Sequence, residues 1–181
     1  MNKLFCVLLL ATMSEAAHCQ TIAPPKKPTG ATASAASQLG WATGLPPKFF
    51  GTYTYTVYLV YDPAHGQKPT NTRGVGGTLT LGAAGSYEKK LQIPGPYGSY
   101  HFDETGRYTI KGQNIEFTYT NSKGKPVTYG GTFSYSEPAL SLSMILNQDA
   151  NGGREVFGLV VKGSESVKRT FNDDGTVKLG S

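Results

Sequence analysis

The sequence has 181 residues, of which 38% are hydrophobic and 16% charged, and its formal net charge is +5. A chain of this length can bury one adequate hydrophobic core. Its basic residues are spread out, in pairs such as Lys89/Lys90 and Lys123/Lys125 that lie far apart. A nucleic-acid surface needs basic residues gathered with aromatic ones on one face, so we expect no nucleic-acid partner.

The first nineteen residues are typical of an export signal. A basic start at Lys3 is followed by an apolar run over residues 4–13 and then by small residues. A run of about ten residues is too short to cross a bilayer core of roughly 30 Å, so we predict a cleavable signal peptide over residues 1–19. We expect a secreted or periplasmic protein, and the alternative is a lipid anchor on Cys19. Cleavage after Cys19 removes both cysteines, and no later segment predicts a membrane span.

Residues 20–48 differ in composition from the rest of the chain. They contain Pro24, Pro25 and Pro28, followed by a stretch of Ala, Ser, Thr and Gly that ends at Pro46 and Pro47. Such a segment buries little apolar surface and keeps its conformational entropy. We therefore predict a disordered, flexible linker over residues 20–48 and a single folded domain over residues 49–181.

From residue 49 onwards, apolar and polar residues alternate in short runs. A period of two sends successive side chains to opposite faces, as in strands with one dry and one wet face. The pattern predicts strands over residues 51–61, 75–81, 87–93, 97–102 and 155–162, alternating segments around residues 108–110, 115–119, 127–129 and 140–146, and a final hairpin over residues 167–179. Turns are expected at residues 103–106, 111–114, 121–124 and 147–153, and a corner at residues 94–96.

This spacing indicates the fold class. No amphipathic helix is predicted after the linker, and strands at intervals of roughly ten residues joined by tight turns are typical of all-β proteins. Because the turns are short and sequential, we predict an antiparallel up-and-down β-barrel of about 8–10 strands. A β-sandwich is the alternative.

Two short segments carry a resemblance to a known family. The first strand opens with Gly51, Thr52 and Tyr53, and residues 106–117 read Gly-Arg-Tyr-Thr-Ile-Lys-Gly-Gln-Asn-Ile-Glu-Phe. These segments resemble the lipocalin-like (calycin-type) group of small exported β-barrels, over residues 49 to about 162. The resemblance implies a binder of a small hydrophobic or amphipathic molecule.

Signatures of catalysis and metal binding are scarce. After the signal, the histidines are His65, in a turn-rich loop, and His101, near a strand end. No glycine-X-serine-X-glycine turn is present to activate a nucleophile, and no histidine pair has metal-ligand spacing. We predict no catalytic residue, no metal site and no cofactor. The sequence favours a protein that is not an enzyme without deciding the question.

The aromatic residues are the compositional feature that points to function. The chain has eleven tyrosines and eight phenylalanines, so most of its rings carry a hydroxyl group. Alternation predicts an inward-facing set: Tyr53, Tyr55, Tyr61, Tyr87, Tyr108, Tyr119 and Tyr129, together with Lys89. Apolar walls with a few hydroxyl groups suit a small-ligand site. The alternative is that tyrosine is frequent because it favours strands and packs well at the rim of a barrel. Lys89 would either meet an acidic headgroup or reach solvent at the open end.

Three functional hypotheses follow, and the third, an enzyme of unknown type, requires two titratable side chains that converge in a pocket, for instance His101 with Asp103 and a serine. In the first, an exported lipocalin-like barrel binds a small apolar or amphipathic ligand through the inward-facing set and catalyses nothing. In the second, the chain is a structural or interaction module that contacts a protein or a glycan and holds no internal ligand. An internal cavity of roughly 300 Å³ or more favours the first. A filled interior with an exposed apolar patch of several hundred Å² favours the second.

Overall fold

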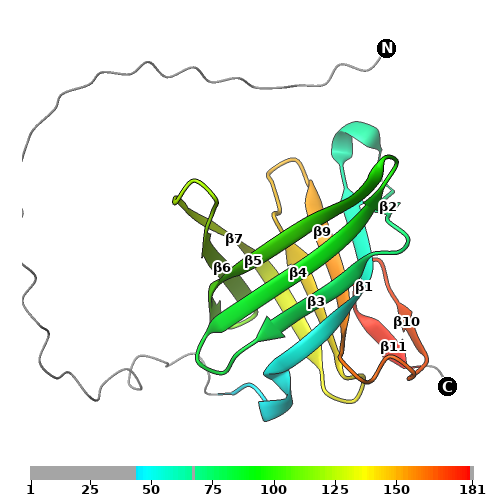
Figure 1. The fold of residues 1–181 in the computed structure, drawn as a ribbon. Helices are drawn as coiled ribbons and strands as arrows, with labels where there is room; N and C mark the ends of the chain where they lie inside the picture. The colour runs from blue at the N-terminus through cyan, green and yellow to red at the C-terminus, as the bar shows by residue number, and fades with distance from the viewer. Residues whose placement is uncertain (1–43, 67, 180–181) are drawn as a thin grey trace, which may run out of the picture. The chain divides into compact units, whose positions relative to one another are not determined.

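The computed structural model describes residues 44–66 and 68–179, whose fold is shown in Figure 1. The predicted signal peptide and residues 20–43 of the predicted linker lie outside the described residues. In chain order, the 3-10 helices and strands are η1 (Pro47–Phe49), β1 (Gly51–Tyr61), η2 (Pro63–His65), β2 (Thr70–Asn71), β3 (Gly76–Leu81), β4 (Ser86–Gly95), β5 (Gly98–Lys111), β6 (Asn114–Thr120), β7 (Pro126–Ser136), β8 (Ser141–Leu146), β9 (Arg154–Val161), β10 (Arg169–Phe171) and β11 (Val177–Leu179). In this part of the chain, no helix has the length and apolar character needed to cross a membrane.

Eight of the strands close into an antiparallel barrel. Successive strands from β3 to β9 pair as neighbours, β1 pairs with β3, and β9 returns to pair with β1. This closing pair is long, and it runs from Tyr53 opposite Val161 to Tyr61 opposite Arg154. The short β2 lies beside the far end of β1, and β10 and β11 form a separate hairpin. The prediction of an all-β, up-and-down barrel is confirmed, and the sandwich alternative is wrong.

Most turns lie where the sequence predicts them, with one exception. Gly112 (φ 60°) and Gly124 (φ 71°) occupy left-handed positions in the β5–β6 and β6–β7 turns, which glycine adopts without strain. The predicted turn at residues 103–106 is wrong, because β5 continues without a break from Gly98 to Lys111. The chain reverses instead at residues 96–97, after the proline-rich end of β4.

Gly106 shows why a turn-like sequence forms part of a strand. A Cβ atom at this position would lie 2.1 Å from the carbonyl oxygen of Thr118 on β6 and 3.0 Å from Cε1 of Tyr87 on β4. The glycine therefore allows a neighbouring backbone and ring to approach closely within the sheet, and it does not reverse the chain. Since the strand stays intact, Glu104 faces the same side of the sheet as Tyr108.

A β-bulge in β1 changes which side chains face the interior. The pairing with β9 shifts register between Tyr55 and Val57, so Thr56 is the extra residue. Tyr55 faces the interior before the bulge, and Tyr58 takes the interior position after it. The strict alternation predicted over residues 51–61 therefore holds only as far as Tyr55.

The bulge places Tyr61 outside the barrel, so the prediction that it faces inward is wrong. The guanidinium carbon of Arg154 lies 3.7 Å from the centroid of the Tyr61 ring. The Tyr61 hydroxyl donates to the backbone carbonyl of Asp173 in the β10–β11 hairpin, at 2.9 Å. Its ring therefore helps to hold this hairpin against the outer surface.

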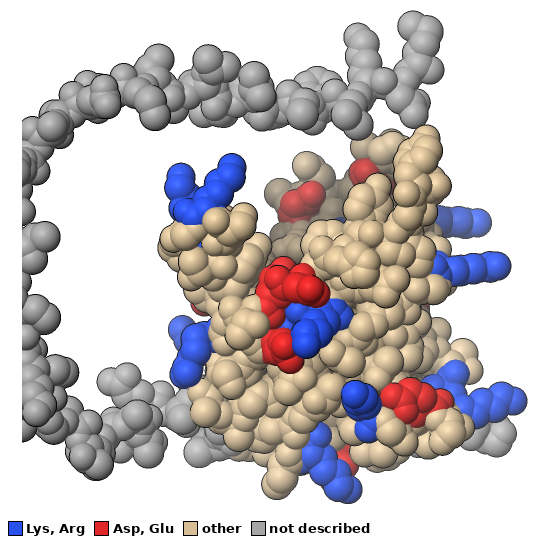
Figure 2. All heavy atoms as spheres, viewed as in Figure 1, with Lys and Arg blue, Asp and Glu red and all other residues tan. Residues whose placement is uncertain are grey.

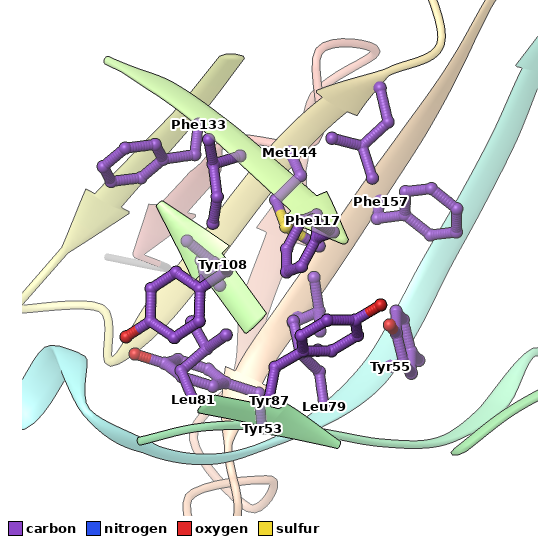
Figure 3. Close-up of a cluster of buried hydrophobic side chains, with 14 of the residues drawn as sticks. Tyr53, Tyr55, Leu79, Leu81, Tyr87, Tyr108, Phe117, Phe133, Met144 and Phe157 are labelled. Atoms are coloured by element: carbon purple, nitrogen blue, oxygen red, sulfur yellow. The ribbon is translucent and has the colours of Figure 1, made fainter. Parts of the chain in front are cut away.

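Buried hydrophobic side chains from several strands pack together inside the barrel (Figure 3). Around Phe49 they fill one end of the interior. Phe49 of η1 is fully buried, and its ring centroid lies 5.5 Å from that of Phe133 and 5.6 Å from that of Tyr135. The hydroxyl of Tyr53 donates to the carbonyl of Phe49 and so fixes η1 to the start of β1. Phe49 therefore closes this end of the barrel.

The β10–β11 hairpin covers part of the outer face. A Cβ atom at Gly158 of β9 would lie 2.7 Å from the ring of Phe171, so the glycine provides room for that ring. Ser143 of β8 donates to the carbonyl of Asp174 at 2.7 Å. Val156, on the outward side of β9, is fully buried. The hairpin thus shields a second, smaller apolar layer from water.

We predict that Gly106→Ala lowers the free energy of unfolding by about 1–3 kcal/mol, because the added methyl group is forced into a packed site. Gly51→Ala is the matched control, since a Cβ atom at Gly51 meets nothing within 4 Å. We expect it to change stability by less than about 0.5 kcal/mol. Urea denaturation followed by circular dichroism measures both values. Equal effects of the two substitutions would contradict the close approach at Gly106.

Candidate functional site

The interior is hollow toward the end of the barrel opposite Phe49. A cavity of about 310 Å³ lies there, at the lower end of the range for small-ligand sites. It opens near Phe102, which is 44% exposed, and near Asn147 in the β8–β9 loop, which is also exposed. The lining residues are Tyr55, Tyr58, Leu79, Lys89, Leu91, Ile93, Phe102, Glu104, Phe117, Tyr119, Tyr129, Met144, Leu146, Asn147, Glu155 and Phe157.

A largely buried ion pair lies in one wall of the cavity. Lys89 on β4 and Glu104 on β5 are opposite each other in the sheet, with Nζ and Oε1 2.6 Å apart. Their side chains are only 14% and 11% exposed. The Tyr129 hydroxyl donates to Oε2 of Glu104 at 2.7 Å and accepts from Nζ of Lys89 at 3.1 Å. Each charge therefore has an opposite charge and a phenol as partners, as a buried pair requires.

The phenols around this pair are held in their neutral form. Burial is the main reason why the pKa values of Tyr55 and Tyr129 are raised, and the negative charge of Glu104 raises both further. Burial also raises the pKa of Tyr87, whose hydroxyl donates to Oε2 of Glu104 at 3.3 Å. Near neutral pH these side chains are therefore hydroxyl donors held in fixed positions.

A second carboxylate lies in the opposite wall. Glu155 is on β9, which is four strands away from β5 in either direction around the barrel. One of its oxygens accepts from the Tyr58 hydroxyl at 2.6 Å, and the other accepts from Nδ2 of Asn147. Asn147 adopts a left-handed backbone conformation (φ 55°), which asparagine tolerates better than most residues. The β8–β9 loop thus brings an amide to Glu155.

The structure brings together part of the set predicted from the sequence. Those that line the cavity are Tyr55, Lys89, Tyr119 and Tyr129. Tyr87 lies beside them through its bond to Glu104. Tyr53 and Tyr108 belong to the packed part of the interior, where their hydroxyls donate to backbone carbonyls, and Tyr61 lies outside. Lys89 pairs with Glu104, and its side chain is only 14% exposed.

Sequence reasoning missed the two carboxylates of the cavity. The expected turn at residues 103–106 hid Glu104, although its even spacing from Tyr108 indicates the inward register. Glu155 carries the same signal, because it is two residues before Phe157 on an apolar strand. Sequence reasoning also missed Tyr58, because the β-bulge that shifts this residue onto the inner face has no signal in the alternation pattern.

Outside the cavity, charged groups gather into no comparable site within the described residues. His65 and Asp62 contact each other at 2.6 Å, but both side chains are well exposed. The hydrogen bond from His65 lowers the pKa of Asp62. In the part of the chain that the structure describes, no three His, Cys, Asp or Glu side chains are placed to hold a metal ion. Figure 2 shows basic and acidic residues scattered over the visible face.

Comparison with known proteins adds no assignment. No model of a known protein family matches the sequence, and a search of the curated proteins found no match. The closed eight-stranded antiparallel barrel is consistent with a calycin-like fold. Because one fold serves many functions, function is inferred here from the residues of the cavity.

We predict that Lys89→Met and Glu104→Gln each lower the free energy of unfolding by about 3 kcal/mol, because each leaves a charge buried without its partner. The double variant removes both charges, so its loss should be smaller than the sum of the single losses. Urea denaturation of the four proteins gives the coupling energy. Strictly additive losses would show that the two groups do not interact.

The buried phenols predict a loss of stability at alkaline pH. Burial raises the pKa of Tyr108 to about 12 and raises those of Tyr55 and Tyr129 as well. The corresponding stability is complete below the ordinary phenol pKa of about 10 and is lost as the pH rises through the folded-state values. We expect tyrosinate absorbance of these residues to appear together with unfolding, whereas a urea-unfolded sample titrates near pH 10. Full ionisation with an intact circular dichroism spectrum would contradict their burial.

Proposed function

We propose that this protein is an exported, lipocalin-like barrel that binds one small amphipathic molecule in its cavity and carries out no reaction on it. The observation that carries the proposal is a cavity of about 310 Å³ that combines ring-lined and aliphatic walls with a few fixed polar groups. This combination is typical of small-molecule sites. The export signal expected over residues 1–19 would place the protein outside the cytoplasm.

The polar groups of the cavity suit an amphipathic ligand. Leu91, Met144 and Leu146 offer an apolar surface to its body. The hydroxyl of Tyr55 has no hydrogen-bond partner among the described residues, so it is available to a polar group of the ligand. The Lys89–Glu104 pair already satisfies its own charges and so acts as part of the wall.

The lining also favours binding over catalysis. Nucleophilic catalysis needs a serine, cysteine or comparable group next to a base. Among the described residues, no serine, threonine or cysteine lines the cavity. Its lysine contacts a carboxylate and a phenol, which leaves it poorly suited to act as a nucleophile.

A second candidate function rests on the exposed end of the β4–β5 hairpin. Tyr97 is 98% exposed, Tyr100 is 56% exposed and Phe102 is 44% exposed. Exposed rings of this kind favour contact with a protein or a glycan. Phe102 also lines the cavity, so the same hairpin would form the entrance under the first proposal.

The proposal predicts binding of N-phenyl-1-naphthylamine, a neutral apolar dye that fluoresces in apolar surroundings. Ile93→Trp should raise its Kd at least about tenfold, because Ile93 lines the cavity and a larger ring would fill it. Gln92→Trp is the matched control, since Gln92 is the preceding residue and is exposed. It should change Kd less than about twofold. A dye that fails to bind the unmodified protein, or that binds both variants equally, would contradict a ligand site in the cavity.

A further inference from the structure

The charges that line the cavity do not balance. Lys89 and Glu104 neutralise each other across 2.6 Å. Glu155 also lines the cavity, so one positive and two negative groups leave a net charge of −1 on its walls. Both oxygens of Glu155 are held by neutral donors, the Tyr58 hydroxyl and the Asn147 amide. These bonds orient the carboxylate without neutralising it.

No residue of the described chain supplies the missing positive charge. No lysine, arginine or histidine lies within ion-pair distance of Glu155 among the described residues. Arg154 is adjacent in sequence but belongs to the other face of β9, where its guanidinium lies over the Tyr61 ring. Glu155 is half-buried, so a cation bound in the cavity would be its first charged partner.

Aromatic side chains line the cavity next to Glu155. Tyr58 stacks on Phe157 with ring centroids 4.9 Å apart, and Tyr55 meets the same ring edge-on at 5.8 Å. Phe157 is two residues from Glu155 on the same face of β9. The faces of aromatic rings carry partial negative charge and attract cations. The rings and the carboxylate therefore favour the same sign of charge.

We infer that the ligand is a cationic amphiphile, an organic amine whose ammonium group lies at Glu155 among these rings and whose apolar body extends toward Met144 and Leu146. This inference rests on the proposed function and specifies its ligand class. With a single positive charge on the ligand, the net charge of the ligand and the lining residues together would be zero. The ammonium group would also donate hydrogen bonds to the carboxylate.

The same residues disfavour an acidic ligand. A carboxylate ligand would meet the uncompensated charge of Glu155 and would compete with Glu104 for Lys89. Glu104 keeps its hold on Lys89 because the Tyr129 hydroxyl binds both groups. A repulsive charge in a site excludes the wrong ligand as effectively as a favourable contact selects the right one.

Three probes with one chain length and different headgroups test this inference: octylammonium, octanol and octanoate. Isothermal titration calorimetry of the full chain at neutral pH gives the three Kd values. We expect octylammonium to bind at least about tenfold more tightly than octanoate, with octanol between them. Equal Kd values, or tightest binding of octanoate, would overturn the cationic assignment.

A charge-neutral variant separates the carboxylate from the rest of the cavity. Glu155→Gln keeps the shape and an oxygen that accepts from Tyr58, so the barrel should fold as before. It should weaken octylammonium binding about tenfold and change octanol binding less than about twofold. Glu116→Gln is the control for net charge, because Glu116 is exposed on the outward face of β6. Equal effects of the two variants on octylammonium would overturn the role of Glu155.

The outcome also separates this inference from the proposed function. If N-phenyl-1-naphthylamine binds the cavity while the three octyl probes show no preference by charge, only the cationic assignment fails. If neither the dye nor any octyl probe binds, the proposed function fails with it.

Discussion

The pairing of β1 with β9 is the constraint on which the rest of the structure depends. It closes the sheet, so that no long edge is left open to other chains and one face becomes an interior. The β-bulge lies within this pairing, and the Thr56 hydroxyl donates to the carbonyl of Gly158 at 2.9 Å. The extra residue reverses the orientation of the following side chains. As a result, Tyr58 faces Glu155 inside the barrel, and Tyr61 is free to hold the β10–β11 hairpin outside. One inserted residue therefore sets both the hydrogen bond from Tyr58 to Glu155 and the contact of Tyr61 with the outer hairpin.

The interior divides into a filled part and a hollow part, and the two have different tasks. In the filled part, Phe49 and the rings near it bury apolar area, which is the main source of folding free energy. In the hollow part, the structure largely buries an ion pair and half-buries Glu155, and such charged groups oppose folding unless they are well partnered. Packing at one end thus compensates for the polar groups at the other. The cross-strand position of Lys89 and Glu104 matters here, because adjacent strands hold the two groups in register without help from flexible loops.

Much of the fold could be predicted from the sequence because alternation is a local property. The bounds of β1 and the hairpin at the C-terminus follow from it directly. Two features could not be predicted because they depend on contacts with residues far away in the sequence. The bulge at Thr56 needs β9 as a partner, and Gly106 is explained only by its neighbours on two other strands. Alternation also predicts which face of the sheet a side chain lies on, but it does not predict at which end of the barrel interior the side chain lies. Tyr53 and Tyr55 share a face, yet the first hydroxyl is tied to the packed end and the second meets the cavity.

The two carboxylates of the cavity differ in their partners, and this difference separates structure from function. Glu104 contacts a lysine and two phenols, so its charge is compensated by Lys89, and its contacts hold β4, β5 and β7 together. Glu155 has partners of comparable geometry, but none of them carries a charge. A group held rigidly and left uncompensated is suited to meet a ligand, because it is already oriented and needs only the opposite charge. Glu104 therefore stabilises the barrel through its ion pair with Lys89, whereas the negative charge of Glu155 has no positively charged partner among the described residues.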